Sequence, residues 1–307
     1  MSLGDSLTPP LLALAAVLLD RLLGEPRRFH PLVGFGRLAD QIERALRRGA
    51  PGQPVANRLR GLAAWCILVM PPVLLAGWLA QPLFDLLLLY FALGAKSLAE
   101  HAEAVAAPLG QGDLPAAREA LSRIVTRETA HLDENGVAAA AVESVLENGH
   151  DAVFGALFWF FVLGGAGALL FRLANTLDAM WGHRDARRRY FGWAAARADD
   201  LLGFIPARLT ALTYALLGSM RTALACWQRQ AKHWPSPNAG PVMAAGCGAL
   251  KVGAGGTARY AGRDEIRPPL GFGPSPSAAD IRRAVALVER GLWLWLFLFA
   301  LGSLAHA

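Results

Sequence analysis

Four carboxylates flank a long apolar stretch in the middle of the chain and are the residues best suited to chemistry. Glu143, Glu147 and Asp151 precede the stretch at successive spacings of four residues, so on a helix they lie along one face. Asp178 follows it, after eighteen residues from Phe154 to Phe171 that carry no charge. Carboxylates aligned in this way repel one another unless a cation lies between them, and Mg²⁺ binds one or two carboxylates together with phosphate oxygens. The spacing therefore predicts a metal–phosphate site at the membrane surface, with a solvated polar helix end as the alternative.

Polar residues directly after the same stretch could hold the phosphate. Arg172, Asn175 and Thr176 follow it within five residues. Arginine binds phosphate through parallel N–H donors, and asparagine and threonine can position it. Ionisable groups beside a membrane segment are costly and are usually functional. We therefore expect substrate binding on this side of the stretch as well.

The elements that must position these groups are apolar helices. Of the 307 residues, 54% are hydrophobic, which exceeds the roughly 45–50% apolar content of soluble domains. Apolar segments lie near 7–23, 61–95, 154–171, 203–227 and 291–305, and polar segments that carry the candidate site lie at 96–151, 172–202 and 228–290. About 20 apolar residues suffice for a helix to cross a bilayer. The sequence predicts an all-α, polytopic integral membrane protein with soluble helical and Gly/Pro-rich loop segments, organised as a single membrane-embedded domain over 1–307.

One apolar segment admits two paths. Gly61 to Phe84 is uncharged over 24 residues and predicts one crossing, kinked at Pro71 and Pro72. Alternatively, Gln81-Pro82 starts a turn, and Leu83 to Ala95 returns as a second, shorter helix.

The central segment also admits two paths. Arginine-rich stretches at 25–60 and 172–197 both belong in the cytoplasm by the positive-inside rule, and so does 96–151 if it handles nucleotide. A single crossing by 154–171 would place its flanks on opposite sides. Gly164, Gly165 and Gly167 allow a re-entrant hairpin, and a buried core helix is the other option; both are favoured over the single crossing.

Charge and motif content exclude several classes of protein. The net charge of +6 arises from arginine clusters that suit anionic lipid or an anionic substrate, and no nucleic-acid-binding motif accompanies them. Three cysteines without C-x-x-C spacing indicate neither zinc nor a disulfide framework. The pattern G-x-x-x-x-G-K-[ST] does not occur, which excludes a P-loop nucleotide site.

Three further features have two interpretations each. Gly253-Ala-Gly255-Gly256 is either a glycine-rich turn or a cradle of N–H groups for phosphate. Asp199-Asp200 is either a second acidic cluster or a cap for the helix that follows. His30, before Pro31, is either a base for an amine substrate or a structural histidine.

Short motifs in a fixed order cover nearly the whole chain. They are Asp20-Arg-Leu-Leu-Gly-Glu-Pro26 with His30-Pro31, Ser122-Arg-Ile-Val-Thr-Arg127-Glu-Thr129 with Leu132-Asp133-Glu134, Glu143-Ser-Val-Leu-Glu147-Asn148 with Asp151, Leu157-Phe-Trp159, Asn175-Thr176-Leu-Asp178-Ala-Met180, Asp199-Asp200 with Ile205-Pro206-Ala-Arg208, His233-Trp-Pro-Ser236-Pro-Asn238-Ala-Gly240, and Ser275-Pro-Ser277. Each motif is modest alone, but their order and spacing make a chance match very improbable. Together they resemble the adenosylcobinamide-phosphate synthase family of cobalamin biosynthesis.

The resemblance implies a multi-pass enzyme of the cell (inner) membrane whose active site faces the cytoplasm. Such an enzyme joins adenosylcobyric acid to (R)-1-aminopropan-2-ol O-phosphate, or to ethanolamine phosphate, by an ATP-dependent amide bond formed through an acyl phosphate. ATP and Mg²⁺ are the implied cofactors. The expected partners are these substrates and membrane lipid, with other membrane enzymes of the pathway and further copies of the chain as additional candidates, and no nucleic acid.

Each candidate residue takes a role on this hypothesis. We expect catalysis from Glu147, Asp178 and His30, and metal binding from Glu143, Glu147, Asp151 and Asp178. The expected substrate- and phosphate-binding residues are Arg127, Asn148, Arg172, Asn175, Thr176, Arg208, Ser236 and Asn238.

The chain departs from the family pattern at several places. Glu128 stands where the family has aspartate, Ala152 replaces a glycine, Ala156 replaces a proline, and Met243 replaces a glutamate. The loss of that last carboxylate puts the role of the final loop in doubt. The competing class is a non-catalytic transporter or a scaffold for corrinoid enzymes, but the polar clusters at the ends of the apolar segments favour chemistry at the membrane surface. A lipid alcohol phosphotransferase would need an Asp-Gly…Ala-Arg…Asp pattern, which does not occur.

Overall fold

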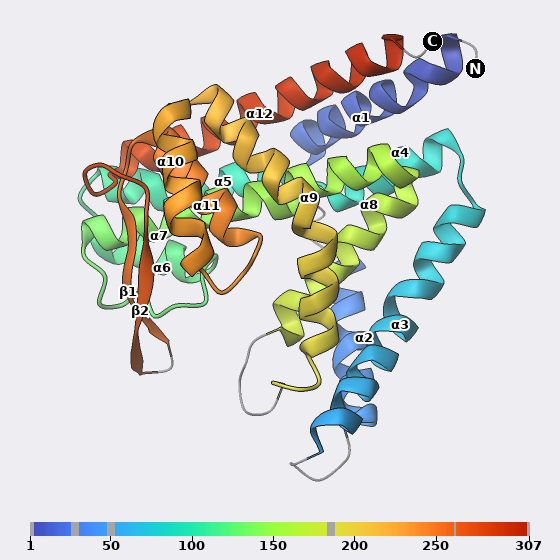
Figure 1. Ribbon diagram of the computed structural model, residues 1–307, viewed down its shortest axis with the longest axis horizontal. Helices are drawn as coiled ribbons and strands as arrows, with labels where there is room; N and C mark the ends of the chain where they lie inside the picture. The colour runs from blue at the N-terminus through green and yellow to red at the C-terminus, as the bar shows by residue number, and fades with distance from the viewer. Residues whose placement is uncertain (1–2, 26–30, 48–52, 183–187, 261, 306–307) are drawn as a thin grey trace. The chain divides into compact units, whose positions relative to one another are not determined.

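The computed structural model describes residues 3–25, 31–47, 53–182, 188–260 and 262–305, and within them the protein is predominantly helical (Figure 1). The elements are α1 (Leu3–Leu23), α2 (Pro31–Leu46), α3 (Pro54–Trp78), α4 (Pro82–Ala92), α5 (Ala95–Gly110), α6 (Leu114–Ser122), α7 (Glu134–Gly149), a π-helix (His150–Phe154), α8 (Gly155–Trp181), α9 (Trp193–Leu217), α10 (Met220–Gln230), a 3₁₀-helix (Ala231–His233), α11 (Ala239–Leu250), β1 (Ala254–Tyr260), β2 (Arg263–Leu270) and α12 (Ala278–Ala305). The predicted all-α class is confirmed, with one small β-hairpin in addition.

Five helical stretches of the described chain are long and apolar enough to cross a membrane. They are Pro54–Trp78, Pro82–Gly110, Glu134–Trp181, Trp193–Leu217 and Ala278–Ala305. In the first two stretches, only 28% and 22% of the most apolar part is buried. Most of these apolar side chains therefore face outward, as lipid-exposed residues do. The polytopic membrane class is therefore confirmed.

The predicted apolar segment 203–227 is not one helix. Helix α9 ends at Leu217 and α10 begins at Met220, after Gly218 and Ser219. The break follows from Gly218, because glycine is the residue that most often ends a helix.

The chain forms two compact units, and neither is continuous in sequence. The first unit contains residues 1–94, 155–203 and 300–307, and the second contains 95–154 and 204–299. The chain passes between them more than once. The prediction of a single functional domain over 1–307 stays a prediction.

In the first unit, α3 and α4 both pack against α8. Trp181 and Phe191 meet edge to face in its core, with ring centroids 5.1 Å apart. Glu43 of α2 is buried there, and its carboxylate accepts hydrogen bonds from Arg188 and forms an ion pair with Arg47. A buried carboxylate of this kind persists only when it is paired.

The segment 61–95 follows the second of its two predicted paths. Helix α3 ends at Trp78, and Gln81 is extended (φ −149°, ψ 151°) before α4 starts at Pro82. The uninterrupted crossing from Gly61 to Phe84 was wrong, because the residue before a proline avoids the helical region and proline fits the first turn of a new helix.

Helix α8 is a helical hairpin rather than a straight rod. Its backbone leaves the helical region at Leu163 (φ −133°, ψ 15°) and Gly164 (φ 66°, ψ −156°), where only glycine adopts the second conformation readily. A Cβ atom on Gly155 would collide with the ring of Phe171, although in an uninterrupted helix these residues would lie roughly 24 Å apart. The two arms therefore lie side by side, so the segment takes the hairpin path that the glycines allow, while its path through a membrane stays a prediction.

Asp85 of α4 holds the tip of this hairpin. Its Oδ1 accepts a hydrogen bond from the Gly165 N–H at 3.1 Å, at the start of the second arm. Unsatisfied N–H groups at a helix start favour a carboxylate, and in a membrane such groups must be satisfied within the protein. The single charge in the apolar run of α4 thus has a structural reason.

In the second unit, the short helix α11 is buried along its whole length and packs against α10 and α7. The strands β1 and β2 pair in antiparallel register, with Thr257 opposite Ile266. Buried Gln230 exchanges two hydrogen bonds with the backbone of Gly271, which fixes the end of β2 to α10. The hairpin was missed from sequence because the segment 228–290 is rich in Gly and Pro.

We expect Asp85→Ala to destabilise the hairpin by about 1 kcal/mol, the typical cost of losing a helix cap. Asp85→Asn retains an acceptor oxygen and should lose less. Thermal unfolding of the purified protein in detergent measures both variants. Equal unfolding temperatures for wild type and Asp85→Ala would show that the contact does not stabilise the hairpin.

Candidate functional site

A buried glutamate holds two arginines together in the second unit. Glu143 of α7 is 1% exposed, and its Oε2 accepts hydrogen bonds from Arg127 and from Arg267 Nη1. Its Oε1 accepts one from the Gly255 N–H at 2.8 Å. The side chains of Arg127 and Arg267 are 11% and 9% exposed. Two guanidinium groups are thus fixed in position before any ligand binds.

Three segments distant in sequence meet at this cluster. Arg127 lies between α6 and α7, Glu143 in α7, and Arg267 in β2. The guanidinium of Arg267 also lies 5.5 Å from the ring centroid of Trp234. Backbone bonds add to the junction: the Glu128 N–H donates to the Arg259 carbonyl at 2.8 Å. The β-hairpin is therefore held against the loop that carries Arg127.

Neighbouring groups keep the Arg267 guanidinium positively charged. Burial alone would lower the pKa of this guanidinium, but the Glu143 carboxylate, and less strongly Tyr260 and Glu147, raise the pKa above its ordinary value. Arg267 therefore stays cationic, and its Nε has no hydrogen-bond partner within the part of the chain that the structure describes.

Sequence reasoning identified Arg127 and Glu143 but missed Arg267 and the role of Gly255. The pair Arg267 and Glu143 is separated by 124 residues, and no local spacing links them. Gly255 lies in β1 with φ 84°, and its N–H is bound to Glu143. The alternative in which this glycine run cradles a phosphate was therefore wrong at Gly255.

The three carboxylates Glu143, Glu147 and Asp151, which the sequence places on one helix face, lie in different environments. Glu143 is locked in ion pairs, whereas Glu147 and Asp151 are partly exposed. Helix α7 ends at Gly149, and Asp151 lies in the π-helix that follows, so the expected α-helical periodicity fails there. Single π-helical turns within α-helices are frequent at functional sites.

The π-helix is stabilised by side chains of α9. The Tyr214 hydroxyl donates to the Leu146 carbonyl at 3.0 Å, where the helical hydrogen-bond pattern changes. His150 is buried, with Nδ1 3.5 Å from the Thr210 hydroxyl and Nε2 3.7 Å from the Asp151 carboxylate. Specific contacts with Tyr214 and Thr210 of α9 therefore hold the π-helix in place.

The predicted metal ligands Glu143, Glu147 and Asp151 lie in the second unit, and Asp178 lies in the first. Among the described residues, no three His, Cys, Asp or Glu side chains are placed to hold a metal ion. Glu143 could coordinate a metal only by releasing its arginines. Glu147 and Asp151 remain suitable, because Mg²⁺ commonly uses one or two carboxylates plus phosphate and water. Magnesium binding stays a prediction, carried by fewer ligands.

Two predicted binding residues of the second unit meet directly. Arg208 donates to the Asn238 Oδ1 at 3.1 Å and lies over the Phe204 ring, 3.4 Å from its centroid. Ser236 Oγ accepts the N–H groups of Asn238 and Ala239, so it caps the start of α11. Asn238 therefore orients Arg208, while Ser236 shapes the loop.

Asn148 also bonds locally. Its Nδ2 donates to the Ser144 carbonyl at 2.8 Å, one turn earlier in α7. The Ser144 hydroxyl in turn donates to the Ile124 carbonyl, close in sequence to Arg127. Asn148 thus lies on the same helix as Glu147, and Ser144 links it to the loop that carries Arg127.

The first unit holds the remaining predicted residues. On the second arm of α8, Arg172 lies 3.6 Å from the Glu25 carboxylate, and Asn175 donates to Asp199 Oδ1 at 3.3 Å. The Thr176 hydroxyl donates to the Arg172 carbonyl of its own helix. Asp178 follows on the same arm. His30 lies outside the described residues.

The two interpretations of Asp199-Asp200 are now separated. Both residues lie inside α9, which begins at Trp193, so they do not cap a following helix. Asp199 instead binds Asn175, and Asp200 forms an ion pair with Arg197 at 3.1 Å. The capping interpretation was wrong, and Asp199 belongs to a polar cluster with Asn175.

A cavity of about 170 Å³ lies beside the Asp20–Glu25 stretch in the first unit. Seven residues line it: Asp20, Gly24, Glu25, Pro31, Tyr90, Phe91 and Leu93. The Tyr90 hydroxyl donates to the Gly24 carbonyl at 2.7 Å, which fixes the turn after α1. Since Glu25 also pairs with Arg172, this cavity opens beside one of the predicted phosphate-binding arginines.

Glu143→Gln should destabilise the second unit by about 3–5 kcal/mol, because it leaves two buried guanidinium groups without a counter-charge. Chemical unfolding monitored by tryptophan fluorescence measures the loss. The control is Glu119→Gln, which breaks an exposed pair with Arg123 and should cost under about 1 kcal/mol. Equal effects of the two variants would contradict a buried, charge-dependent junction.

A sequence profile of the CobD/Cbib protein family matches residues 13–288. The chain is 61% identical over 287 residues to the cobalamin biosynthesis protein CobD of Chromobacterium violaceum, covering 91% of this chain and 92% of that protein. It is 55% identical over 303 residues to the protein of the same name from Stutzerimonas stutzeri, covering 96% and 98%. The Rhodobacter capsulatus protein of that name is 41% identical over 301 residues, covering 90% and 92%. No solved structure matches.

Proposed function

The chain belongs to the CobD/Cbib protein family, and from this premise we propose that it forms the amide bond between adenosylcobyric acid and an amino-alcohol phosphate, driven by ATP. The relatives are named for cobalamin biosynthesis, which supports a role in that pathway. The observation that carries the finer proposal is the pair of guanidinium groups held by Glu143, with Glu147 one helical turn away.

Amide formation in water needs an activated carboxylate. In the proposed reaction, a carboxylate oxygen of adenosylcobyric acid attacks the γ-phosphorus of ATP, and the bond to the β–γ bridging oxygen breaks to release ADP. The amine of the amino-alcohol phosphate then attacks the acyl carbon, and the acyl–oxygen bond breaks to release phosphate. The amine loses a proton to a base in this step. Both steps place negative charge on phosphate oxygens, so fixed cations are the main requirement.

The arginines are suited to that requirement. Arg127 and Arg267 are positioned by Glu143, Arg208 is oriented by Asn238, and Arg172 lies beside Glu25. Preorganised donors stabilise developing charge without having to rearrange during the reaction. We propose that these groups bind the phosphates of ATP and of the amino-alcohol phosphate.

Glu147 and Asp151 are the proposed magnesium ligands in the second unit. Both are partly exposed carboxylates, and they lie on successive turns of the α7–π-helix segment. A bound Mg²⁺ would neutralise phosphate charge and orient the transferred group. Asp178 as a further ligand and His30 as the base that takes the amine proton are proposed on the sequence alone.

The proposed location is the inner membrane, with the reacting groups on the cytoplasmic side where ATP is found. The helical stretches long enough to span a membrane and the arginine-rich segments support this orientation. Membrane lipid is the expected surrounding, and other membrane enzymes of the pathway and further copies of the chain are proposed partners.

One assay separates this proposal from a transporter or a scaffold. Protein purified in detergent is incubated with ATP, Mg²⁺, adenosylcobyric acid and each amino-alcohol phosphate in turn, and the corrinoid is analysed by mass spectrometry. The expected product has the mass of the amide, and one ADP forms per amide. Failure to form any amide with either amino-alcohol phosphate, by protein that binds the corrinoid, would favour the non-catalytic alternative.

We expect Glu147→Gln to slow the chemical step roughly a hundredfold or more, because it removes a charge that would hold the metal at the phosphates. Raised Mg²⁺ should restore part of the rate by mass action. Asp178→Asn should behave in the same way. Single-turnover amide formation at limiting and at high Mg²⁺ is the measurement.

The matched control is Glu134→Gln, an exposed glutamate at the start of α7 that should leave the rate nearly unchanged. If Glu147→Gln and Asp178→Asn both turn over normally at limiting Mg²⁺, the two carboxylates are structural and the site assignment is wrong.

A further inference from the structure

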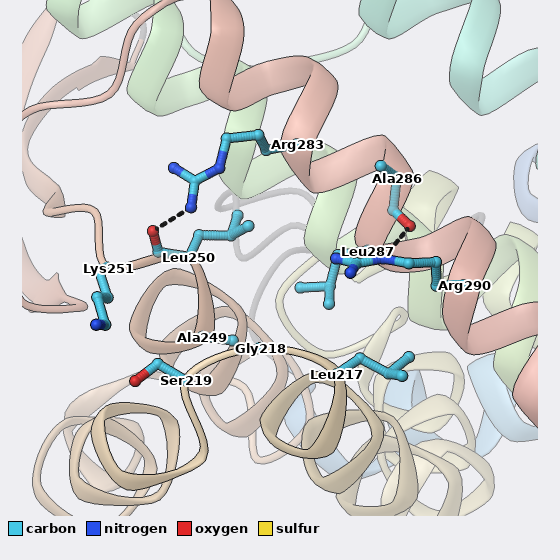
Figure 2. A pocket seen from close by; sticks show the side chains of 10 residues that line it. All are labelled: Leu217, Gly218, Ser219, Ala249, Leu250, Lys251, Arg283, Ala286, Leu287 and Arg290. Carbon is cyan, nitrogen blue, oxygen red and sulfur yellow. Dashed lines mark hydrogen bonds between the residues drawn. The ribbon is translucent and has the colours of Figure 1, made fainter.

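Another cavity, in the second unit, is lined by none of the residues that were given a catalytic or binding role above. It has a volume of about 530 Å³ and is formed by the α9–α10 turn, the end of α11 and the first part of α12. Figure 2 shows Arg283 and Arg290 projecting from α12, and Lys251 at the end of α11. The turn of Leu217, Gly218 and Ser219 forms the opposite wall. This volume is within the range of sites that bind small molecules.

The charged lining of this cavity, which we call the basic pocket, is cationic. Its three charged residues are Lys251, Arg283 and Arg290. Arg283 has an acidic partner, Asp280, at 2.6 Å. Among the ion pairs of the described residues, none joins Lys251 or Arg290 to a carboxylate. The pocket therefore holds positive charge that a bound anion could neutralise.

The side chains of α12 are held in position without using all their donors. Arg290 Nε donates to the Ala286 carbonyl at 3.2 Å, one turn earlier in its own helix. Arg283 Nη2 donates to the Leu250 carbonyl at 2.9 Å. Each guanidinium carries five N–H donors, so others remain for a ligand.

The backbone around the pocket is compatible with an anion. Carbonyls at the end of α11, which would repel one, already accept hydrogen bonds: Ala249 from the Ser219 N–H at 3.0 Å, and Leu250 from Arg283. Helix α10 starts beside the pocket at Met220, and Ser219 does not cap it with its side chain. Helices α9 and α11 end at the pocket, so the three cationic side chains, and not the helix dipoles, give it its positive charge.

The position of the pocket along the spanning helices indicates where the anion comes from. In α12, Arg290 is the last charged residue, and Trp293 and Phe297 beyond it are 41% and 63% exposed. In α9, Leu212 and Leu216 are 42% and 51% exposed just before the pocket. Large apolar side chains exposed on such helices face lipid, and basic residues at their edge lie at headgroup level.

We propose that the basic pocket binds a phosphate group, and that its source is the headgroup of an anionic phospholipid. A soluble phosphate compound shares the same chemistry, so the experiment must separate the two sources. The proposal concerns a site whose lining includes no residue of the Glu143 cluster, and it does not depend on the proposed ligase reaction.

The test uses the full-length protein in a zwitterionic detergent. Its thermal unfolding is followed while short-chain phosphatidylglycerol, short-chain phosphatidylcholine, inorganic phosphate or ATP is added. We expect phosphatidylglycerol to raise the unfolding temperature in a saturable manner, and phosphatidylcholine to have little effect because its headgroup carries no net charge.

The variant that tests the site is Lys251→Asn with Arg290→Gln. Asparagine tolerates the left-handed conformation of Lys251 (φ 57°), and Arg290 bonds only to its own helix, so both changes should preserve folding. Each basic residue near an anionic headgroup raises the affinity about fivefold. The affinity of the double variant for phosphatidylglycerol should therefore fall by a factor on the order of ten or more. The matched control is Arg229→Gln with Lys232→Asn, which removes the same charges from exposed positions outside the pocket.

The outcomes distinguish the sources. Stabilisation by phosphatidylglycerol that weakens in the pocket variant but not in the control supports the lipid headgroup. Stabilisation by inorganic phosphate or ATP with the same variant dependence supports a phosphate site but overturns lipid as its source. Equal responses in the pocket variant and the control, or no response to any of the four compounds, overturns the site.

Discussion

The ion pairs of buried glutamates with arginines are the interaction on which the polar part of this protein depends. Glu143 accepts donors from Arg127, Arg267 and the backbone of Gly255, and all of these lie in different segments. A carboxylate removed from water is stable only when its charge and its lone pairs are satisfied. The loop before α7 and the β-hairpin must therefore both be in place for α7 to bury this residue. The first unit uses the same device, where Glu43 binds Arg188 and Arg47.

The apolar surroundings impose a second constraint, on the backbone. A helical hairpin within a membrane protein exposes N–H groups at its tip, and no water is available deep in a bilayer to satisfy them. Asp85 supplies an acceptor to Gly165, and Gly164 supplies the conformation that the reversal needs. The hairpin in turn places Arg172, Asn175 and Asp178 on its second arm. A single carboxylate in an otherwise apolar helix thus supports the position of three candidate residues of the first unit.

Local patterns in the sequence predicted local structure well and predicted long-range pairing poorly. The apolar segments could be predicted, and the reversal of α8 and the turn at Gln81 were among the alternatives that the sequence offered, because length, glycine and proline act within a few residues. Arg267 could not be found, since its partner Glu143 is 124 residues away and buried charge pairs have no spacing rule. The π-helix at His150 was missed for a related reason: it is supported by Tyr214 of α9, not by its own sequence. In the second unit, Arg208 and Asn238 were both selected by motif, but only the structure shows that one orients the other.

The difference between Glu143 and Glu147 shows how environment assigns roles to residues that spacing makes equal. Both lie on one face of α7, four residues apart, and on sequence alone either could bind a metal. Burial decides between them, because Glu143 is enclosed and has given both oxygens to hydrogen-bond donors, while Glu147 is partly open. An acid that is already neutralised by two arginines gains little from a cation, whereas its task of fixing those arginines is one that phosphate chemistry requires. The same spacing that aligned the two carboxylates thus places a partly exposed acid one helical turn from the residue that fixes two guanidinium groups, and this is the arrangement that the proposed binding of a magnesium-bound phosphate requires.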